Sequence, residues 1–287
     1  MAKSNAHKFG QMIGDLLEVA IIDKLKPVCK EYNMYLDYQH MRKARNNKKK
    51  VRWEDEDGNK HDLDIVIEIN GSEEKLGDPK AFIEMAWRRS TRHSKNKVQE
   101  IAGAVLPIVK KYNRLSPFYG AVLAGEFTSS SLHQLESQGF KVLYFDIGTI
   151  IQSFKLIGLE IEWDDNTDED IIAEYIKFFN VVSSEDKDKL IEYIFKSNEE
   201  KLNQFIKSLK DCFLRKVERI RIFTLYGDIV EVDSIDKAIE YINNHDKENT
   251  KIDTLIGYEI YVKYNNGDKM EAEFKEKRDV LRFLNEL

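Results

Sequence analysis

The chain has 287 residues, 42% of them hydrophobic and 33% charged, which suits one large domain or two modest ones with a real core. Charges of both signs argue against disorder. No apolar run approaches the roughly 20 residues that span a bilayer, and the first residues lack the apolar stretch of a signal peptide. The two cysteines, Cys29 and Cys212, form no metal or redox motif. We therefore expect a cytoplasmic protein without a membrane partner.

The net charge of −6 hides an asymmetry along the chain. Residues 1–120 hold 23 Lys and Arg against 17 Asp and Glu, whereas residues 121–287 hold 22 against 34. A polyanion would therefore meet the N-terminal part first, because the acidic remainder would repel it.

The first predicted element is a long helix from about Asn5 to Tyr32, in which apolar residues recur at helical spacing. The basic stretch 41–50 is expected to be a loop or an exposed arm. Three strands should follow, at Val51–Glu54, from about Asp62 to Ile69, and at Ala81–Trp87, the first two joined by a turn at Asp55–Lys60. The first two strands should form a hairpin, because Asp-Gly is a strong turn dipeptide.

A helix is then predicted from Ser94 to Tyr112. Strands and helices alternate after it, as strand 118–127, helix 129–139, strand 140–146 and helix 148–158. Short links between such elements favour parallel pairing of the strands. The pattern predicts an α/β layer architecture.

The remaining chain is predicted to form a connector and a small domain. Residues 167–217 are highly charged and helical in pattern. Residues 221–242 and 258–284 form a weak internal repeat of strand, turn, strand and helix. Two such units suggest a four-stranded sheet backed by two helices, because a lone hairpin buries too little surface. The predicted parts are 1–165 as an α/β core, 166–217 as a helical connector and 218–287 as an α+β domain.

Two acids within apolar strands carry the main functional hypothesis. Asp64 opens the strand that continues Ile-Val-Ile, and Glu84 lies inside AFIEMAW. A carboxylate in a buried strand is costly unless a cation or a donor satisfies it. Two such carboxylates on neighbouring strands are best explained by a shared Mg²⁺, for which Mn²⁺ is expected to substitute, with the Met85 carbonyl as a further ligand.

The order helix, hairpin, Asp strand, Glu strand, helix, strand, helix, strand over about residues 5–157 resembles the PD-(D/E)xK nuclease superfamily, which includes most type II restriction endonucleases. The resemblance implies a restriction-endonuclease-like core, a mixed central sheet flanked by helices. Asp64 matches the family's metal-binding aspartate and Glu84 its metal-binding glutamate. Glu18, in GDLLE, resembles the helix glutamate that often reaches the metal.

One position departs from the family pattern. The family usually has a lysine two residues after the glutamate, and that position is Ala86. Some members draw this base from the following helix. Lys97 and Lys95 both flank the inward apolar stripe of that helix, and Lys97 lies slightly nearer by helical angle. Lys97 is therefore the preferred catalytic base and Lys95 the second choice.

Basic residues near the two acids are candidates for DNA contact. Arg88, Arg89 and Arg92 directly follow the Glu84 strand and are placed to hold backbone phosphates. The basic run before the hairpin is a second candidate, although charge runs are usually solvated loops. It comprises Arg42, Lys43, Arg45, Lys48, Lys49 and Lys50. Trp53 and Trp87 are expected to pack in the core and not to stack on bases.

The resemblance implies a Mg²⁺-dependent endonuclease acting on double-stranded DNA, in its leading form a type II restriction enzyme. Such an enzyme is expected to be a homodimer, because cutting both strands needs two sites. A structure-specific repair or recombination nuclease is the alternative enzyme. A DNA-binding module with a decayed site stays open because of Ala86. A protein adaptor that works through its acidic C-terminal half is a further alternative.

Overall fold

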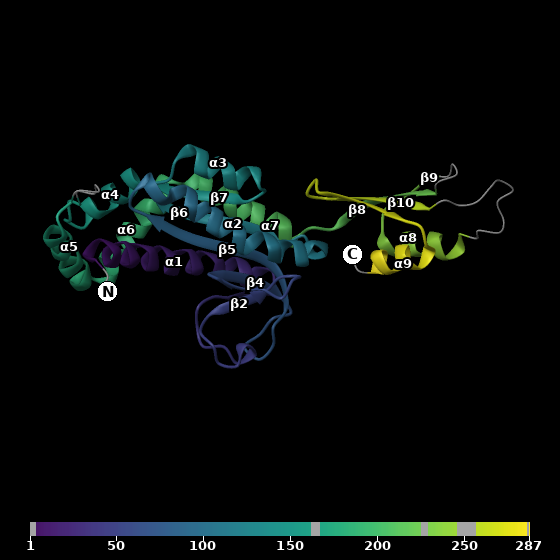
Figure 1. The fold of residues 1–287 in the computed structure, drawn as a ribbon, viewed down its shortest axis with the longest axis horizontal. Helices are drawn as coiled ribbons and strands as arrows, with labels where there is room; N and C mark the ends of the chain where they lie inside the picture. The colour runs from purple at the N-terminus through teal and green to yellow at the C-terminus, as the bar shows by residue number, and fades with distance from the viewer. Residues whose placement is uncertain (1–3, 162–166, 225–228, 246–256, 286) are drawn as a thin grey trace. The chain divides into compact units, whose positions relative to one another are not determined.

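The computed structural model describes residues 4–161, 167–224, 229–245, 257–285 and 287. The chain divides into two compact units, Met1–Lys210 and Asp211–Leu287 (Figure 1). Unit 1 is a mixed α/β layer structure with a mixed central sheet flanked by helices. Unit 2 contains an antiparallel sheet with two helices.

The first helix, α1 (Asn5–Glu31), lies as the sequence predicts. Its N-cap is Ser4, whose side chain accepts a hydrogen bond from the backbone N–H of His7. Pro27 lies inside the helix without ending it. The apolar face of α1 is buried against β1, β5 and α5. The buried side chains of this face include Phe9, Ile13, Leu17, Ile21 and Leu25.

Five strands form the central sheet of unit 1 in the order β1-β4-β5-β6-β7. The strands β1, β4 and β5 pair antiparallel, whereas β5, β6 and β7 pair parallel. This parallel part is the one that the alternation of strands and helices predicts. The sequence analysis missed β1, which is four residues long and pairs with β4. The strands are β1 (Met34–Asp37), β4 (Ile65–Ile69), β5 (Asp78–Arg88), β6 (Phe118–Gly125) and β7 (Lys141–Asp146).

The strand predicted from Asp62 to Ile69 is split in the structure. Its first part, β3 (Lys60–Leu63), pairs with β2 (Val51–Glu54) in a separate two-stranded hairpin. Its second part, β4, belongs to the central sheet. Asp64 is the bend residue between them. It therefore lies at the point where the chain changes from one sheet to the other.

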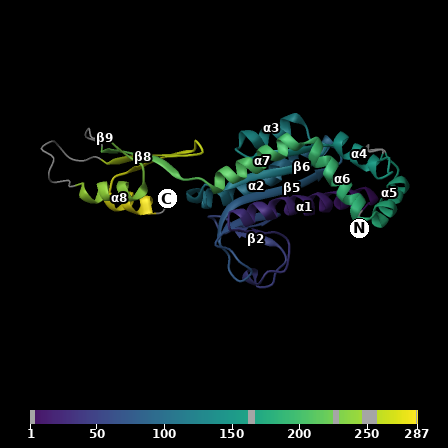
Figure 2. The same ribbon diagram turned by 180° about the vertical axis from the view of Figure 1, so that it is seen from behind.

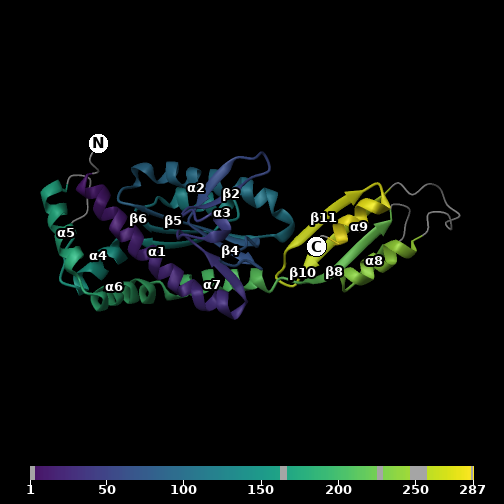
Figure 3. The same cartoon turned by 90° about the horizontal axis from the view of Figure 1, so that it is seen from below.

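Helices cover both faces of the central sheet (Figure 3). One face packs on α2 (Ser94–Lys111) and α3 (Ser129–Ser137), in a core that includes Phe82 and Ala86. The other face packs on α1 and α4 (Ile147–Leu156). Because side chains alternate along a strand, Glu84 shares the α2 face with Phe82 and Ala86, and Met85 and Trp87 face α1.

The predicted connector consists of three helices, all of which pack on unit 1. The helices are α5 (Glu169–Val181), α6 (Ser184–Ser197) and α7 (Glu199–Phe213). Phe205 of α7 and Phe118 of β6 lie 5.3 Å apart between ring centroids. α5 packs on α1, with the ring centroids of Phe179 and Phe9 6.3 Å apart, and α6 packs on α4. Figure 2 shows α6 and α7 from the side opposite to Figure 1. The apolar faces of α5 and α6 thus complete unit 1, which extends to Lys210.

Unit 2 has the architecture that the internal repeat predicts. Its sheet is antiparallel in the order β11-β10-β8-β9, so the two hairpins pair through β8 and β10. Ala238 and Val280, equivalent helix positions of the two repeats, are both fully buried. The predicted turn at residues 226–228 lies outside the described residues. The elements are β8 (Val217–Thr224), β9 (Ile229–Val232), α8 (Ile235–Asn244), β10 (Tyr258–Tyr264), β11 (Lys269–Phe274) and α9 (Lys277–Asn285).

Two arginines of the basic stretch 41–50 are buried in unit 1. The Arg42 guanidinium is fully buried and bonds both carboxylate oxygens of Glu68, at 2.6 and 2.9 Å, and Asp37 at 2.7 Å. Arg45 also pairs with Asp37 and donates to backbone carbonyls. Both guanidinium groups are therefore neutralised and hydrogen-bonded within the protein. Arg42 and Arg45 have a structural role in place of the expected DNA contact.

Replacing Arg42 by alanine is expected to destabilise unit 1 by about 3–5 kcal/mol, because Glu68 would be left buried without its cation. Urea unfolding of the full chain measures this loss. The matched control is Lys43→Ala, since the Lys43 side chain is 72% exposed. Equal stability of the two variants, together with weaker DNA binding by Arg42→Ala, would contradict the structural role.

Candidate functional site

The candidate site lies where β5 runs past the start of β4. The pairing of these strands begins at Ile65, which lies opposite Ile83. Beyond Ile83, β5 pairs on one edge with β6 and, among the described residues, with no strand on its other edge. Asp64 lies at this other edge of β5, opposite β6. Its Oδ2 accepts a hydrogen bond from the Met85 N–H at 2.7 Å, and Glu84 Oε1 accepts one from the Asp64 N–H at 3.2 Å. These two bonds hold the acids side by side.

The two acids lie where negative charge is unfavourable. Burial, followed by repulsion from Asp64, raises the pKa of Glu84 to about 8. Burial also raises the pKa of Asp64, although the bond from the Met85 N–H and the charge of Lys97 oppose the rise. A bound cation would relieve both costs at once, because it would stabilise the ionised forms of neighbouring carboxylates.

Glu18 adds a third acid from α1. Its side chain is half-buried, and its pKa is raised to about 7 by burial, then by the charges of Asp64 and Asp15. Glu18 thus faces Asp64 from the α1 side of the sheet, whereas Glu84 lies on the α2 side. Glu18 therefore lies close enough to Asp64 for their charges to interact, but among the described residues it forms no three-acid metal group with Asp64 and Glu84.

Lys97 approaches the two acids from α2. Its side chain is 16% exposed, and its charge lowers the pKa of both Asp64 and Glu84. Its Nζ is held by Glu100 Oε1 at 2.8 Å. Lys95 is exposed, and no interaction seen in the described residues joins it to either acid. The geometry therefore favours Lys97 over Lys95.

The position of Ala86 explains how a lysine from α2 can reach the acids. Ala86 is buried in the same core cluster as Val98 of α2. Since Ala86 lies two residues after Glu84, it shares the face of β5 on which Glu84 lies. Its small side chain leaves this face to groups from α2. Lys97 thus supplies positive charge on the same face where the family pattern places its lysine.

The ligands available here, two carboxylates, suit Mg²⁺ better than a metal ion that needs three or more protein side chains. Within the described ranges, no three His, Cys, Asp or Glu side chains are grouped so as to hold a metal ion. Mg²⁺ is usually bound through one or two carboxylates and keeps several of its waters. Asp64 and Glu84 supply such a pair. The Met85 N–H is used by Asp64, which places the Met85 backbone beside the same two acids.

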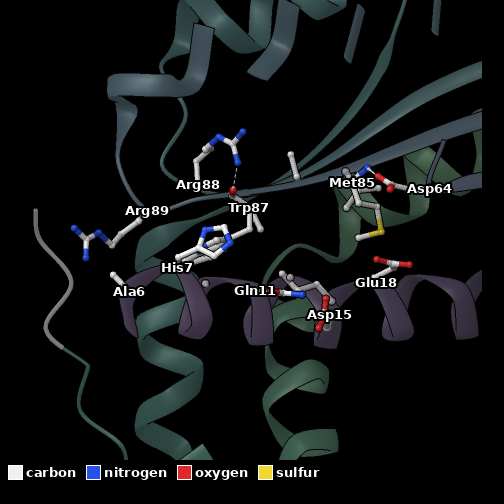
Figure 4. A pocket seen from close by; sticks show the side chains of 16 residues that line it. Ala6, His7, Gln11, Asp15, Glu18, Asp64, Met85, Trp87, Arg88 and Arg89 are labelled. Atoms are coloured by element: carbon white, nitrogen blue, oxygen red, sulfur yellow. Dashed lines mark hydrogen bonds between the residues drawn. The ribbon is translucent and has the colours of Figure 1, made fainter. Parts of the chain in front are cut away.

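A cavity of about 540 Å³ opens on the α1 side of this site (Figure 4). It is lined by α1 and by the end of β5, with two residues of β6. Its acidic end contains Asp15, Glu18 and Asp64, and its other end contains His7 and Arg89, whereas the Arg88 guanidinium points to the opposite side of β5 (Figure 4). The cavity thus joins a site suited to a cation with a site suited to an anion.

The remaining predicted DNA contacts are distributed over the surface of unit 1. Arg92 is exposed in the turn before α2, and Lys43, Lys48, Lys49 and Lys50 are exposed. Two of these lysines have acidic partners, Lys43 with Glu74 at 3.4 Å and Lys50 with Asp62 at 2.6 Å. Arg88 and Arg89 are the predicted bases that line the cavity.

Of the polar cavity residues of α1, sequence reasoning identified Glu18 and missed the other three. His7, Gln11, Asp15 and Glu18 all line the cavity. Their spacing of four, four and three residues places them on one face of a helix, so a polar stripe along α1 was the available signal. Glu100 was also missed, although it lies three residues after Lys97 at the spacing of a helical ion pair.

The metal-free protein is expected to lose stability as pH rises from about 5 to 8. Glu84 and Glu18 have folded-state pKa values of about 8 and 7, against an ordinary value of 4.5. The folded state therefore binds more protons than the unfolded state across this range, and its stability falls as those protons leave. Thermal unfolding in EDTA measures the decline, and Mg²⁺ should raise Tm more at pH 8 than at pH 6.

The control for this pH dependence is Asp62→Asn. Hydrogen bonding to Arg52 helps to lower the pKa of Asp62 to about 2, so Asp62 does not titrate in this range. Glu84→Gln should flatten the decline and Asp62→Asn should leave it unchanged. A Tm independent of pH in EDTA would contradict the raised pKa values.

Comparison with known proteins adds no family. No family model matches the sequence, and no curated protein matches it. One similar solved structure is described as a protein of unknown function, AF1548, at 14% identity over 71% of this chain and 96% of that chain, with a TM-score of 0.29. A likeness at this TM-score carries no argument about fold or function. No helix in the described part of the chain has the length and apolar character to cross a membrane.

Proposed function

We propose that the protein is a Mg²⁺-dependent endonuclease that hydrolyses phosphodiester bonds of DNA. The observation that carries this proposal is the pair of buried Glu84 and partly buried Asp64. Glu84 accepts from the Asp64 N–H, Asp64 accepts from the Met85 N–H, and the charge of Lys97 acts on both acids. Structural acids usually pair with cations that neutralise them, as Asp37 and Glu68 do. Asp64 and Glu84 instead keep raised pKa values, which is typical of groups that await a ligand.

The mechanism assigns a role to each group beside this edge of β5. Asp64 and Glu84 would hold Mg²⁺, which when bound supplies an activated water and offsets charge on the phosphate. The Lys97 ammonium would donate hydrogen bonds to a non-bridging oxygen of the scissile phosphate, where negative charge grows in the transition state. Glu100 holds this ammonium at 2.8 Å and keeps it oriented before substrate binds.

Backbone phosphates away from the cleaved bond need only positioning. Arg88 ends β5, and Arg89 and Arg92 follow it closely enough for the three to hold such phosphates near the acids. Lys48, Lys49 and Lys50 are exposed and remain candidates for outer contacts. Such contacts supply affinity that falls with salt, without reading sequence.

Incubation of methylated and unmethylated plasmid with Mg²⁺ or EDTA tests the proposed function. Discrete fragments that need Mg²⁺ would indicate a type II restriction enzyme, expected to be a homodimer. Cleavage confined to branched, mismatched or unpaired DNA would indicate a structure-specific nuclease. Salt-dependent binding without cleavage in either Mg²⁺ or Mn²⁺ would overturn the proposal in favour of a DNA-binding module.

A further inference from the structure

We propose that the cavity between α1 and the end of β5 holds one unpaired nucleotide of the strand that is cut. DNA with a single-stranded segment, a flap or a frayed end is then the substrate class. The cleavage part of this inference rests on the proposed function, whereas the binding part does not.

The size of the cavity selects a single strand. A volume of about 540 Å³ lies within the ~300–1,000 Å³ range of pockets that enclose small ligands, and a nucleotide is such a ligand. A duplex is wider than its ~12 Å major groove, so a cavity of about 540 Å³ has no room for both strands. A strand that reaches the acidic end through this cavity must therefore leave its partner strand, as in enzymes that act on extruded bases.

The walls of the cavity suit a base. Met85 and Trp87 from β5 and Val122 and Ala124 from β6 form an apolar side. Trp87 packs closely on α1, since a Cβ at Gly10 would lie 2.9 Å from the indole Nε1. The indole is thus fixed beside the cavity (Figure 4). Aromatic side chains held in this way are the usual stacking platforms for unpaired bases, whichever base is present.

The two ends of the cavity suit two neighbouring parts of one strand. His7 and Glu18 lie eleven residues apart on α1, which corresponds to ~16 Å at 1.5 Å per residue. A scissile phosphate at Asp64 would leave the sugar and base of the unpaired nucleotide beside Met85 and Trp87, and the strand would continue toward His7 and Arg89. The order of charges along the cavity therefore matches the order of groups along a nucleotide strand.

Substitution of Gly14 by a larger residue would fill the cavity with a side chain without displacing the residues that line it. A Cβ at Gly14 would meet Trp87 Cβ at 3.8 Å, an ordinary contact distance. Leucine at this position would extend into the cavity, whereas alanine would add the Cβ alone. Gly14→Leu is therefore the test variant and Gly14→Ala its matched control, and thermal unfolding checks that both fold.

The binding experiment uses the full chain carrying Glu84→Gln, with a fluorescent single-stranded oligonucleotide and a closed hairpin duplex of the same sequence, in EDTA. Stacking of one base should make the single strand bind about tenfold tighter than the hairpin. Gly14→Leu should remove this preference and Gly14→Ala should keep it. Equal affinity for both DNAs, or a preference that survives Gly14→Leu, would overturn the inference. Competition by a free deoxynucleoside monophosphate as effective as that of the strand would overturn the assignment to a strand.

The cleavage experiment separates this inference from the proposed function. Wild-type protein with Mg²⁺ should cut flapped or bubble DNA about tenfold or more faster than closed circular duplex. Cleavage that depends on Glu84 but is equal on both DNAs would leave the proposed function standing and overturn the cavity assignment. Preferred binding of the single strand with no cleavage of any DNA would support the cavity and refute the nuclease.

Discussion

Replacement of Glu84 by glutamine is expected to abolish Mg²⁺-dependent cleavage, with a loss of about 10³-fold or more. A metal ion stabilises the transition state of phosphodiester hydrolysis by several kcal/mol, and each 1.36 kcal/mol corresponds to a factor of ten in rate. Glutamine keeps the shape of Glu84 and the acceptor for the Asp64 N–H, which is bonded at 3.2 Å. The variant should therefore fold and lose the charge alone. Single-turnover cleavage of flapped and duplex DNA measures the loss.

Asp62→Asn is the matched control for this experiment. Asp62 lies two residues before Asp64, but it is exposed and paired with Lys50 and Arg52, each at 2.6 Å. Its replacement should change the cleavage rate little, because exposed ion pairs contribute little. Cleavage by Glu84→Gln at the rate of the Asp62→Asn control would remove the basis of the proposed metal site.

Replacement of Lys97 by methionine is the second decisive change, and we expect it to lower the cleavage rate by about 10²–10³-fold, the usual effect of removing one donor to developing negative charge. Methionine keeps the apolar stem of the side chain, which is mostly buried. The control is Lys95→Met, since Lys95 is exposed on the same helical turn. Cleavage on a matched DNA substrate at saturating Mg²⁺ compares the two variants.

A rescue experiment tests whether Lys97 replaces the lysine that the family pattern places at Ala86. Ala86 lies on the same face of β5 as Glu84 and packs on α2. Adding Ala86→Lys to Lys97→Met should restore part of the lost rate, because the new ammonium would reach the same acids. A larger loss from Lys95→Met than from Lys97→Met would instead assign the base to Lys95.

Local patterns in the sequence were enough to predict most elements of both units. The helices α1 and α2 begin and end within a residue of their predicted bounds, because their apolar spacing and caps are local signals. The repeat in unit 2 predicted its sheet and helices for the same reason. The short strand β1 was missed, since four residues carry too little pattern and depend on pairing with β4.

Contacts between distant residues decided what local pattern could not. The strand predicted across Asp64 is broken because β3 pairs with β2 while β4 joins the central sheet. The charged helices α5 and α6, predicted as a connector, pack on α1 and α4 through their apolar faces. Arg42 and Arg45 looked like solvated bases, but acids from other segments bury them. In each case the partner segment lies far away in the sequence, or its pairing cannot be predicted from the spacing of apolar residues.

The sequence by itself determined the candidate acids Asp64 and Glu84, since a carboxylate amid apolar strand residues is a conspicuous cost. It also showed that Ala86 occupies the position where the resemblance implies a lysine. The tertiary structure decided that the charge of Lys97 acts on these acids, that Glu18 approaches Asp64 from α1, and that a cavity with opposite charges at its ends adjoins them. The physical reason is the sequence distance between the interacting residues. The cost of burying a carboxylate follows from the apolar residues next to it in the sequence, whereas the electrostatics and shape of a site depend on which distant segments pack together.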